Sequence, residues 1–223
     1  IKLCRAGATP VGEESGLSDI KGYAVDTPAH GGSAGERSER DLLDDFAAHV
    51  CGFINTEGLR PLKVIADTAN GMGGLVVPEV FKHLPFELEV MYPELDGTFP
   101  NHEANPLVES NMDDLRAAVK QHGAPLGVAF DGDADRCAFV DEEGRTVHAD
   151  LITAILARGF LERKPGAGII YDLRSSKVLP ETIEKLGGEY RFSTRVDDFE
   201  LETGEDGVQK ICGLHLSTGE FLP

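Results

Sequence analysis

The hydrophobic positions between residues 41 and 140 follow two periods that alternate along the chain. Apolar residues three or four positions apart predict helices with one buried face, and the segments with this spacing are 41–54, 75–83 and 111–121. Short apolar or alternating segments predict strands, and these are 62–66, 86–91, 126–130 and 137–140. The strand–helix–strand order predicts an α/β fold with mixed, largely parallel sheets layered with helices.

The pattern on either side of this region is less regular. Residues 26–40 are rich in glycine, serine and charge, which suggests a flexible boundary. Beyond residue 146, the expected helices are 150–162 and 179–186, and the expected strands are 167–172 and 190–193. Residues 197–207 are acidic and turn-rich, with no clear period. We therefore predict three parts, with the last atypical after residue 196: 1–36, 37–145 and 146–223.

The composition is that of a globular protein. Hydrophobic residues make up 41% and charged residues 27% of the 223 residues, which is ordinary for a soluble domain. No apolar stretch is long enough to span a bilayer and the N-terminus is not a signal peptide, so we expect a cytoplasmic protein without membrane partners. The net charge of −18 and the pI near 4.7 argue against non-specific nucleic-acid binding. The four cysteines are scattered and are expected to be free thiols: Cys4, Cys51, Cys137 and Cys212.

Three carboxylates alternate in a short segment between two predicted strands: Asp131, Asp133 and Asp135. Gly132 and the density of acids favour a loop over a continued strand. Alternating acids in a turn can direct their oxygens at one centre, as a hard divalent cation requires. Arg136 follows directly and places a fixed positive charge beside that centre, a pairing that suits phosphate. The segment therefore predicts a Mg²⁺ site that handles phosphate.

Three other interpretations of this acidic loop stay open on the residues alone. With Glu142 at position twelve, the acids have the spacing of an EF-hand calcium loop, although position six is Arg136 instead of glycine and the flanks look like strands. The loop could also be an acidic hairpin turn without a ligand. In an aspartyl-phosphate phosphatase, Asp131 would be the nucleophile.

A second loop, residues 67–74, joins a predicted strand to a predicted helix and contains three glycines. Its backbone N–H groups could hold an anion at the helix N-terminus. The loop matches neither the GxGxxG nor the GxxxxGK[ST] pattern of nucleotide-binding loops. Because glycine so often serves turns, a tight structural turn is the preferred interpretation.

Several segments, taken in order, resemble the phosphohexomutase family, which contains phosphomannomutase, phosphoglucomutase and phosphoglucosamine mutase. The segments are IKLCRAGATPVGEESGL, DTANGMGG, LDGTFPNHEANPL, LGVAFDGDADR and IIYDLRSSKVLPETIEKLGGE. The likeness runs from residue 1 to about residue 196 and is strongest to the phosphomannomutase/phosphoglucomutase branch. The resemblance implies a four-domain isomerase, of which this chain would hold the end of the first domain, the second domain with the metal loop, and the third domain.

The family resemblance also implies a mechanism. A phosphoserine of the first domain exchanges a phosphoryl group with a hexose phosphate, which interconverts the 1- and 6-phosphates of mannose or glucose through a hexose 1,6-bisphosphate. In such an enzyme Mg²⁺ and the neighbouring arginine offset charge on the transferring phosphoryl group. The implied site residues are Asp131, Asp133 and Asp135 for the metal, Lys2 and Arg136 for catalysis, and Arg195 for substrate binding.

The sequence departs from the family pattern in several places. The TASHNP-like segment that carries the serine is expected shortly before Ile1 and is not among the 223 residues. After Val196 the family continues with Gly-His, whereas here two aspartates follow. Neither the GGExSGH-like loop that reads the sugar nor a recognisable fourth domain is present. The 223 residues alone are therefore expected to be inactive, and a non-catalytic role in binding metal and sugar phosphate stays open.

Overall fold

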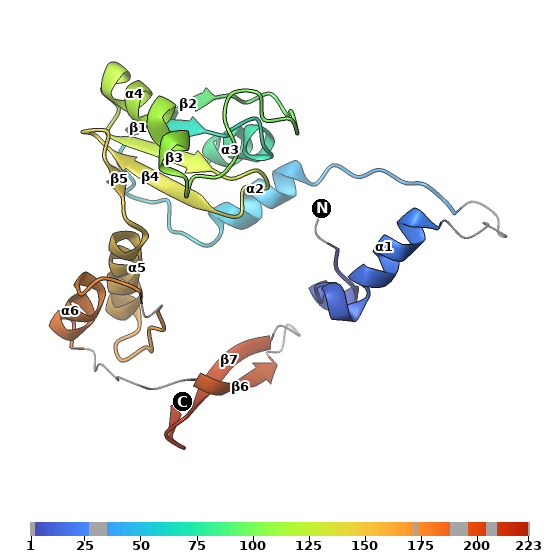
Figure 1. The fold of residues 1–223 in the computed structure, drawn as a ribbon. Coiled ribbons are helices and arrows are strands. Elements are labelled where there is room, and N and C mark those ends of the chain that lie inside the picture. Colours follow the sequence, from blue (N-terminus) through green and yellow to red (C-terminus); the bar gives the residue numbers. More distant parts are fainter. Residues whose placement is uncertain (1–2, 27–34, 172–173, 188–195, 204–208, 223) are drawn as a thin grey trace. The chain divides into compact units, whose positions relative to one another are not determined.

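The computed structural model describes residues 3–26, 35–171, 174–187, 196–203 and 209–222 (Figure 1). The chain divides into two compact units, Ile1–Asp41 and Leu42–Pro223. In the first unit, 3-10 turns at Ala6–Ala8 and Glu13–Ser15 lead into helix α1, Leu17–Val25. No residue of these three elements is buried, so they form no hydrophobic core. The further division predicted near residue 146 stays a prediction.

The second unit is built on a five-stranded sheet with the strand order β2-β1-β3-β4-β5 (Figure 1). Its strands are β1 Leu62–Asp67, β2 Phe86–Met91, β3 Leu126–Phe130, β4 Cys137–Asp141 and β5 Thr146–Val147. β1 pairs in parallel with β2 and with β3, whereas β4 and β5 continue the sheet in antiparallel order. The mixed α/β fold class is therefore confirmed, as are the four strands predicted between residues 62 and 140.

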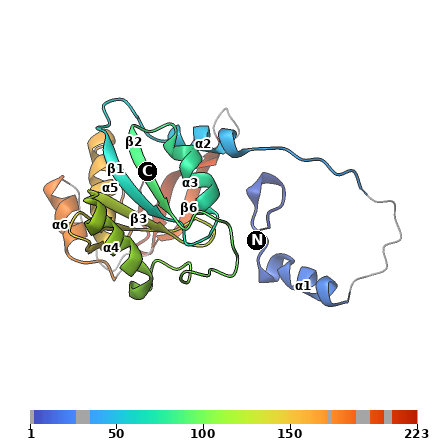
Figure 2. The same ribbon diagram turned by 90° about the horizontal axis from the view of Figure 1, so that it is seen from above.

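Helices cover both faces of this sheet (Figures 1 and 2). Neighbouring residues of a strand point to opposite faces. Ile65 of β1 therefore packs with helix α4 (Asp113–His122), and Val64 packs with helix α3 (Gly73–Phe81). The buried cluster on the α4 face consists of Ile65, Met112, Leu115, Val119, Ala124, Ala129 and Val140. The buried cluster on the α3 face consists of Val64, Ala66, Val77 and Val128. The sheet is thus the middle of three layers.

The helices around the sheet lie where the sequence predicts them, with shifted ends. They are α2 Leu43–Cys51, α3 Gly73–Phe81 and α4 Asp113–His122, the last preceded by a 3-10 turn at Glu109–Met112. Asp113 and Asp114 occupy the first turn of α4, where the positive end of the helix dipole favours carboxylates. Gly123 ends the helix in the left-handed conformation (φ 59°), which glycine adopts without strain. Local sequence signals therefore set both ends of α4.

The two helices predicted after residue 146 are also present, as α5 Ala149–Arg163 and α6 Val178–Lys185. They share a buried cluster of Ala154, Ala157, Leu161, Leu179 and Ile183. The strand predicted at 167–172 is wrong over its described residues 167–171, which form no strand. Its alternating apolar side chains, Ala167, Ile169 and Tyr171, pack against the α5–α6 cluster instead. The alternation reflects packing on helices and not a sheet ladder.

A second sheet follows, with antiparallel strands in the order β6-β7-β8 (Figure 1). Its strands are β6 Val196–Thr203, β7 Gln209–Leu216 and β8 Phe221–Leu222. The segment 197–207, described from the sequence as turn-rich and without a clear period, is a strand over residues 197–203. Register shifts between Val196 and Asp198 and between Glu200 and Leu201 interrupt the alternation of side chains, which hides the period. The strand predicted at 190–193 lies outside the described residues.

Candidate metal centre

The acidic loop is a six-residue hairpin loop between β3 and β4. The last pair of the ladder joins Phe130 to Cys137, and the N–H of Asp131 donates to the carbonyl of Arg136 at 3.1 Å. Ala134 adopts a φ of 58°, and its N–H donates to the carbonyl of Asp131 at 3.1 Å. Because strands and not helices flank the loop, the EF-hand interpretation is excluded.

This hairpin brings the three predicted metal ligands together. One oxygen each of Asp131, Asp133 and Asp135 lies within 4.8 Å of the others. Asp131 is 1% exposed, whereas the other two side chains are exposed. Oxygens bound to Mg²⁺ lie about 3.0 Å apart on adjacent positions and about 4.2 Å apart on opposite ones, since each is about 2.1 Å from the ion. The three carboxylates would therefore have to move closer together to hold Mg²⁺, which keeps several waters as its other ligands. No other such group of three occurs among the residues that the structure describes.

Arg136 binds Asp131 through two donors. Its Nε donates to Oδ2 at 2.8 Å, and its backbone N–H donates to Oδ1 at 3.0 Å. The Nε also lies 3.6 Å from Oδ1 of Asp135. The hydrogen bond from Arg136 to Asp131, and the charge of that carboxylate, raise the pKa of the guanidinium. A permanent positive charge therefore stands beside the three acids and offsets part of their mutual repulsion.

Two neighbouring loops contact the backbone of the acidic loop at Gly132. The N–H of Met72 donates to the Gly132 carbonyl at 3.0 Å, and a Cβ on Gly71 would lie 2.7 Å from that oxygen. On the other side, a Cβ on Gly132 would lie 3.3 Å from the ring of Phe99 and 3.6 Å from Ala104. The three loops meet because they follow the parallel strands β1, β2 and β3, whose carboxyl ends share one edge of the sheet.

The glycine-rich loop at 67–74 is a tight turn, as preferred from the sequence. The N–H of Gly71 donates to the carbonyl of Thr68 at 2.7 Å, and the N–H of Gly74 donates to that of Gly71 at 3.0 Å. The Thr68 hydroxyl donates to the carbonyl of Tyr92 at 2.9 Å. The N–H groups of Gly71, Met72 and Gly74 thus bind protein carbonyls, so the structure favours a turn over an anion cradle.

A partly buried acid–imidazole pair near these loops was missed by the sequence reasoning. The Nε2 of His102 lies 3.0 Å from Oδ2 of Asp67, which is 0% exposed. The Nδ1 of His102 lies 2.9 Å from the carbonyl of Glu103. A carbonyl oxygen only accepts hydrogen bonds, so Nδ1 of His102 carries a proton. A second proton lies between Nε2 of His102 and the Asp67 carboxyl group. Both residues lie in family-like segments, DTANGMGG and LDGTFPNHEANPL, which was the available signal.

Several side chains near this pair have shifted pKa values. Burial raises the pKa of Asp67, and the neighbouring His102 opposes that shift only in part. Burial acts against the charge of His102, but the Glu103 carbonyl and Asp67 outweigh it and raise the pKa of the imidazole. Tyr92 donates to Oδ2 of Asp114 at 2.8 Å. This hydrogen bond, with burial, raises the pKa of Tyr92 to about 12.

Two predicted site residues, Lys2 and Arg195, lie outside the described residues, and their roles stay predictions. The expectation of free thiols is confirmed for the three cysteines whose side chains are described, Cys4, Cys51 and Cys137. None of the described helices has the length and apolar character that crossing a membrane requires.

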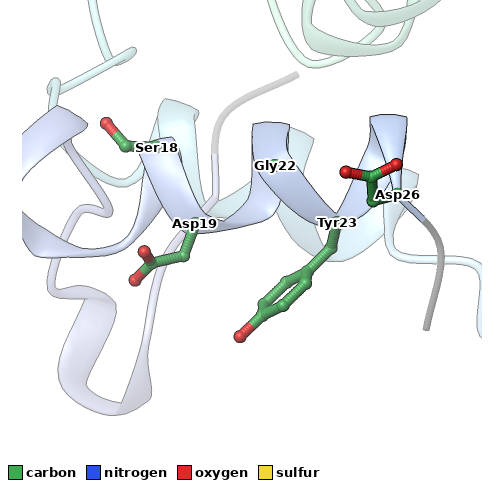
Figure 3. Close-up of a pocket in the computed structure, with 5 residues that line it drawn as sticks. All are labelled: Ser18, Asp19, Gly22, Tyr23 and Asp26. Atoms are coloured by element: carbon green, nitrogen blue, oxygen red, sulfur yellow. The ribbon is translucent and has the colours of Figure 1, made fainter.

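Two hollows lie elsewhere on the described surface. One, of about 410 Å³, lies along α1 and is lined by Ser18, Asp19, Gly22, Tyr23 and Asp26 (Figure 3). The side chains of Asp19 and Tyr23 project from the same side of this exposed helix. The other, of about 390 Å³, is lined mostly by apolar side chains of α5 and of residues 167–170. Neither resembles a catalytic site as closely as the acidic loop does.

Comparison with known proteins gives the family of the chain. Residues 43–144 match the family described as phosphoglucomutase/phosphomannomutase, alpha/beta/alpha domain II. The chain is 39% identical to a phosphomannomutase of Escherichia coli (strain K12) over 84% of its own length and 43% of that protein. It is 37% identical to a phosphoglucomutase of Neisseria meningitidis serogroup A over 70% of its length and 33% of that protein.

A solved structure agrees with these sequence matches. The crystal structure of a phosphoglucomutase/phosphomannomutase family protein from Burkholderia thailandensis superimposes with a TM-score of 0.67 at 32% identity, over 80% of this chain and 38% of that one. Residues 43–144 therefore belong to the second domain of the phosphoglucomutase/phosphomannomutase family, and the similarity to phosphohexomutases extends over about four fifths of the chain. The chain spans about two fifths of the length of curated relatives that it matches.

Proposed function

We propose that the complete protein interconverts hexose 1-phosphate and hexose 6-phosphate, with mannose or glucose as the sugar. The observation that carries this proposal is the convergence of Asp131, Asp133 and Asp135 beside Arg136 in one hairpin loop. The matched relatives, which are named phosphomannomutases and phosphoglucomutases, support the choice of sugars. The reaction would proceed through a phosphoserine and a hexose 1,6-bisphosphate in a cytoplasmic enzyme.

The acidic loop would hold Mg²⁺ through its three aspartates. A bound Mg²⁺ would neutralise charge on the transferring phosphoryl group, where electrostatics and positioning supply most of the catalysis. Asp131 is anchored by two hydrogen bonds from Arg136, while Asp133 and Asp135 are exposed toward solvent, from which a hexose phosphate arrives. Arg136 keeps its positive charge beside them and would attract the anionic group of the substrate.

The remaining roles in this proposal come from the family resemblance. Lys2 would act as a general acid or base next to the reacting hydroxyl, and Arg195 would bind the sugar phosphate. The phosphoserine would belong to a part of the complete protein outside these 223 residues, since the chain spans about two fifths of its curated relatives. The 223 residues alone would then bind the metal without turning over substrate.

The decisive experiment is a mutase assay of the complete encoded protein with glucose 1-phosphate and mannose 1-phosphate, with Mg²⁺ and after EDTA treatment. We expect Mg²⁺-dependent turnover, and a loss on the order of 100-fold or more in Asp133→Asn, the size seen when one stabilising group is removed from a transition state. Asp141→Asn is the control, because it makes the same Asp-to-Asn change in the next hairpin turn, where Asp141 pairs with Arg145 outside the acidic loop.

Three results would contradict this proposal. Full activity in a folded Asp133→Asn protein would remove the metal role of the acidic loop. An inactive complete protein would remove the mutase assignment. Hydrolysis of phosphate esters by the 223 residues alone would instead favour an aspartyl-phosphate phosphatase with Asp131 as nucleophile.

A further inference from the structure

Four side chains cross-link the two loops that contact the acidic loop at Gly132. His102 Nε2 and Asp67 Oδ2 lie 3.0 Å apart, and the Nδ2 of Asn101 donates to the Oδ1 of Asn70 at 2.7 Å. Each pair joins the loop after β1 to the loop after β2. The two loops are therefore tied to each other by side chains in addition to their backbone hydrogen bonds.

The cross-linking residues are close in sequence to the residues that lie around Gly132. In the loop after β2, Asn101 and His102 lie between Phe99 and Ala104, whose side chains would lie 3.3 Å and 3.6 Å from a Cβ on Gly132. We call the four residues that lie around Gly132 the Gly132 clamp: Gly71, Met72, Phe99 and Ala104. In the loop after β1, Asn70 directly precedes the first clamp residue. Each cross-linking residue therefore lies one to four positions from a clamp residue of its own loop.

The backbone at the clamp is held in conformations that need support. Ala69 and Phe99 have φ values of 47° and 50°, in the left-handed region that residues other than glycine and asparagine disfavour. Such conformations persist where the surrounding structure over-determines them. The buried pair Asp67–His102 and the pair Asn70–Asn101 supply side-chain support at these positions.

We propose that His102 is a positioning residue for the divalent-cation site: through Asp67 it closes the Gly132 clamp and so sets the spacing of Asp131, Asp133 and Asp135 before a cation arrives. This inference rests on the proposed function in taking the acidic loop as a Mg²⁺ site. His102 itself touches neither the metal nor the substrate. It holds the acidic loop in one arrangement before the cation binds. Less conformational entropy is then lost on binding, which is how pre-organised sites gain affinity.

Positioning and simple charge effects predict opposite results when His102 is replaced. A change in charge alone would strengthen cation binding, because a protonated imidazole repels a cation. Loosening the clamp would weaken cation binding, because the acidic loop would have to be ordered at the moment of binding. The sign of the change in affinity therefore separates the two effects.

The test uses the 223-residue chain and Mn²⁺ as a spectroscopic substitute for Mg²⁺, with free Mn²⁺ measured by electron paramagnetic resonance. We expect His102→Leu to weaken Mn²⁺ binding about tenfold, the lower part of the 10- to 100-fold range for residues that orient metal ligands. His102→Gln should stay within about threefold of the original chain, because a glutamine amide has a donor at the same bond count from Cβ and can still reach Asp67.

The matched control is His122→Leu. His122 also pairs with a carboxylate, Glu89, at 2.7 Å, but it lies at the end of α4 and outside the clamp. If His102→Leu does not fold, Asn101→Ala removes the other cross-link without leaving a buried charge and should weaken Mn²⁺ binding in the same direction. Unchanged or tighter binding in these folded variants would overturn the positioning role alone. Failure of the original chain to bind Mn²⁺ at all would overturn the metal site and with it the proposed function.

Discussion

The contact between the glycine-rich loop and the acidic loop can be tested with a single methyl group. Gly71 is in an ordinary backbone region, so alanine is not strained there, but its Cβ would lie 2.7 Å from the carbonyl oxygen and 2.9 Å from the Cα of Gly132. Both obstructing atoms are backbone atoms and cannot move by a change of rotamer. Gly71→Ala should therefore push the acidic loop away from the loop at 67–74.

The magnitude follows from the distances. Ordinary contacts of a Cβ begin at 3.4 Å, so the loops must separate by roughly 0.7 Å from the 2.7 Å contact. Overpacking of this kind costs about 1–3 kcal/mol. Alanine also stiffens the unfolded chain, which stabilises the protein by about 0.4–1 kcal/mol. We expect a net loss of about 1–2 kcal/mol in the free energy of unfolding, together with weaker Mn²⁺ binding.

Urea unfolding followed by circular dichroism measures the stability, and Mn²⁺ titration measures the affinity. Gly97→Ala is the control, because no atom lies within 4 Å of its Cβ position and its φ is not in the left-handed region. That variant should equal or slightly exceed the original stability and bind Mn²⁺ unchanged. If Gly71→Ala behaves like Gly97→Ala in both measurements, the two loops do not touch as described and the reasoning fails.

Two further predictions concern titration. The pKa values of His102 and Asp67 are both raised, so the folded chain retains protons that the unfolded chain has released, and stability falls as pH rises. For His102 the loss of stability begins above the ordinary pKa of 6.5 and continues through its raised pKa. Urea unfolding between pH 6 and 9 should therefore show a smaller fall in the free energy of unfolding for His102→Gln than for the original chain. An equal dependence of this free energy on pH in both proteins would contradict the pairing of His102 with Asp67. The hydrogen bond to Asp114 and burial raise the pKa of Tyr92 to about 12. Absorbance titration at 295 nm should therefore show a transition near pH 12 that is absent from Tyr92→Phe, and an unchanged titration curve in that variant would contradict the hydrogen bond.

Local patterns explain which predictions were confirmed. β2 and β3 begin and end where alternating or apolar segments do, because side-chain alternation is a property of a few consecutive residues. The same local pattern failed at 167–171, where the alternating side chains pack on α5 and α6. It also failed at 197–203, where register shifts disrupt the alternation. The pattern of apolar residues alone does not determine whether an alternating segment pairs with a strand or packs against helices.

The candidate metal ligands could be predicted because all three lie within five consecutive residues, so a single turn brings them together. The pair of Asp67 and His102 could not, because 35 residues separate them. They meet only since β1 and β2 lie side by side in parallel, so that the loops after both strands leave the same edge of the sheet. Residue identities over short spans thus determine the acidic loop and its chemistry. The tertiary structure decides which distant loops enclose it, because that depends on strand order, which no short segment contains.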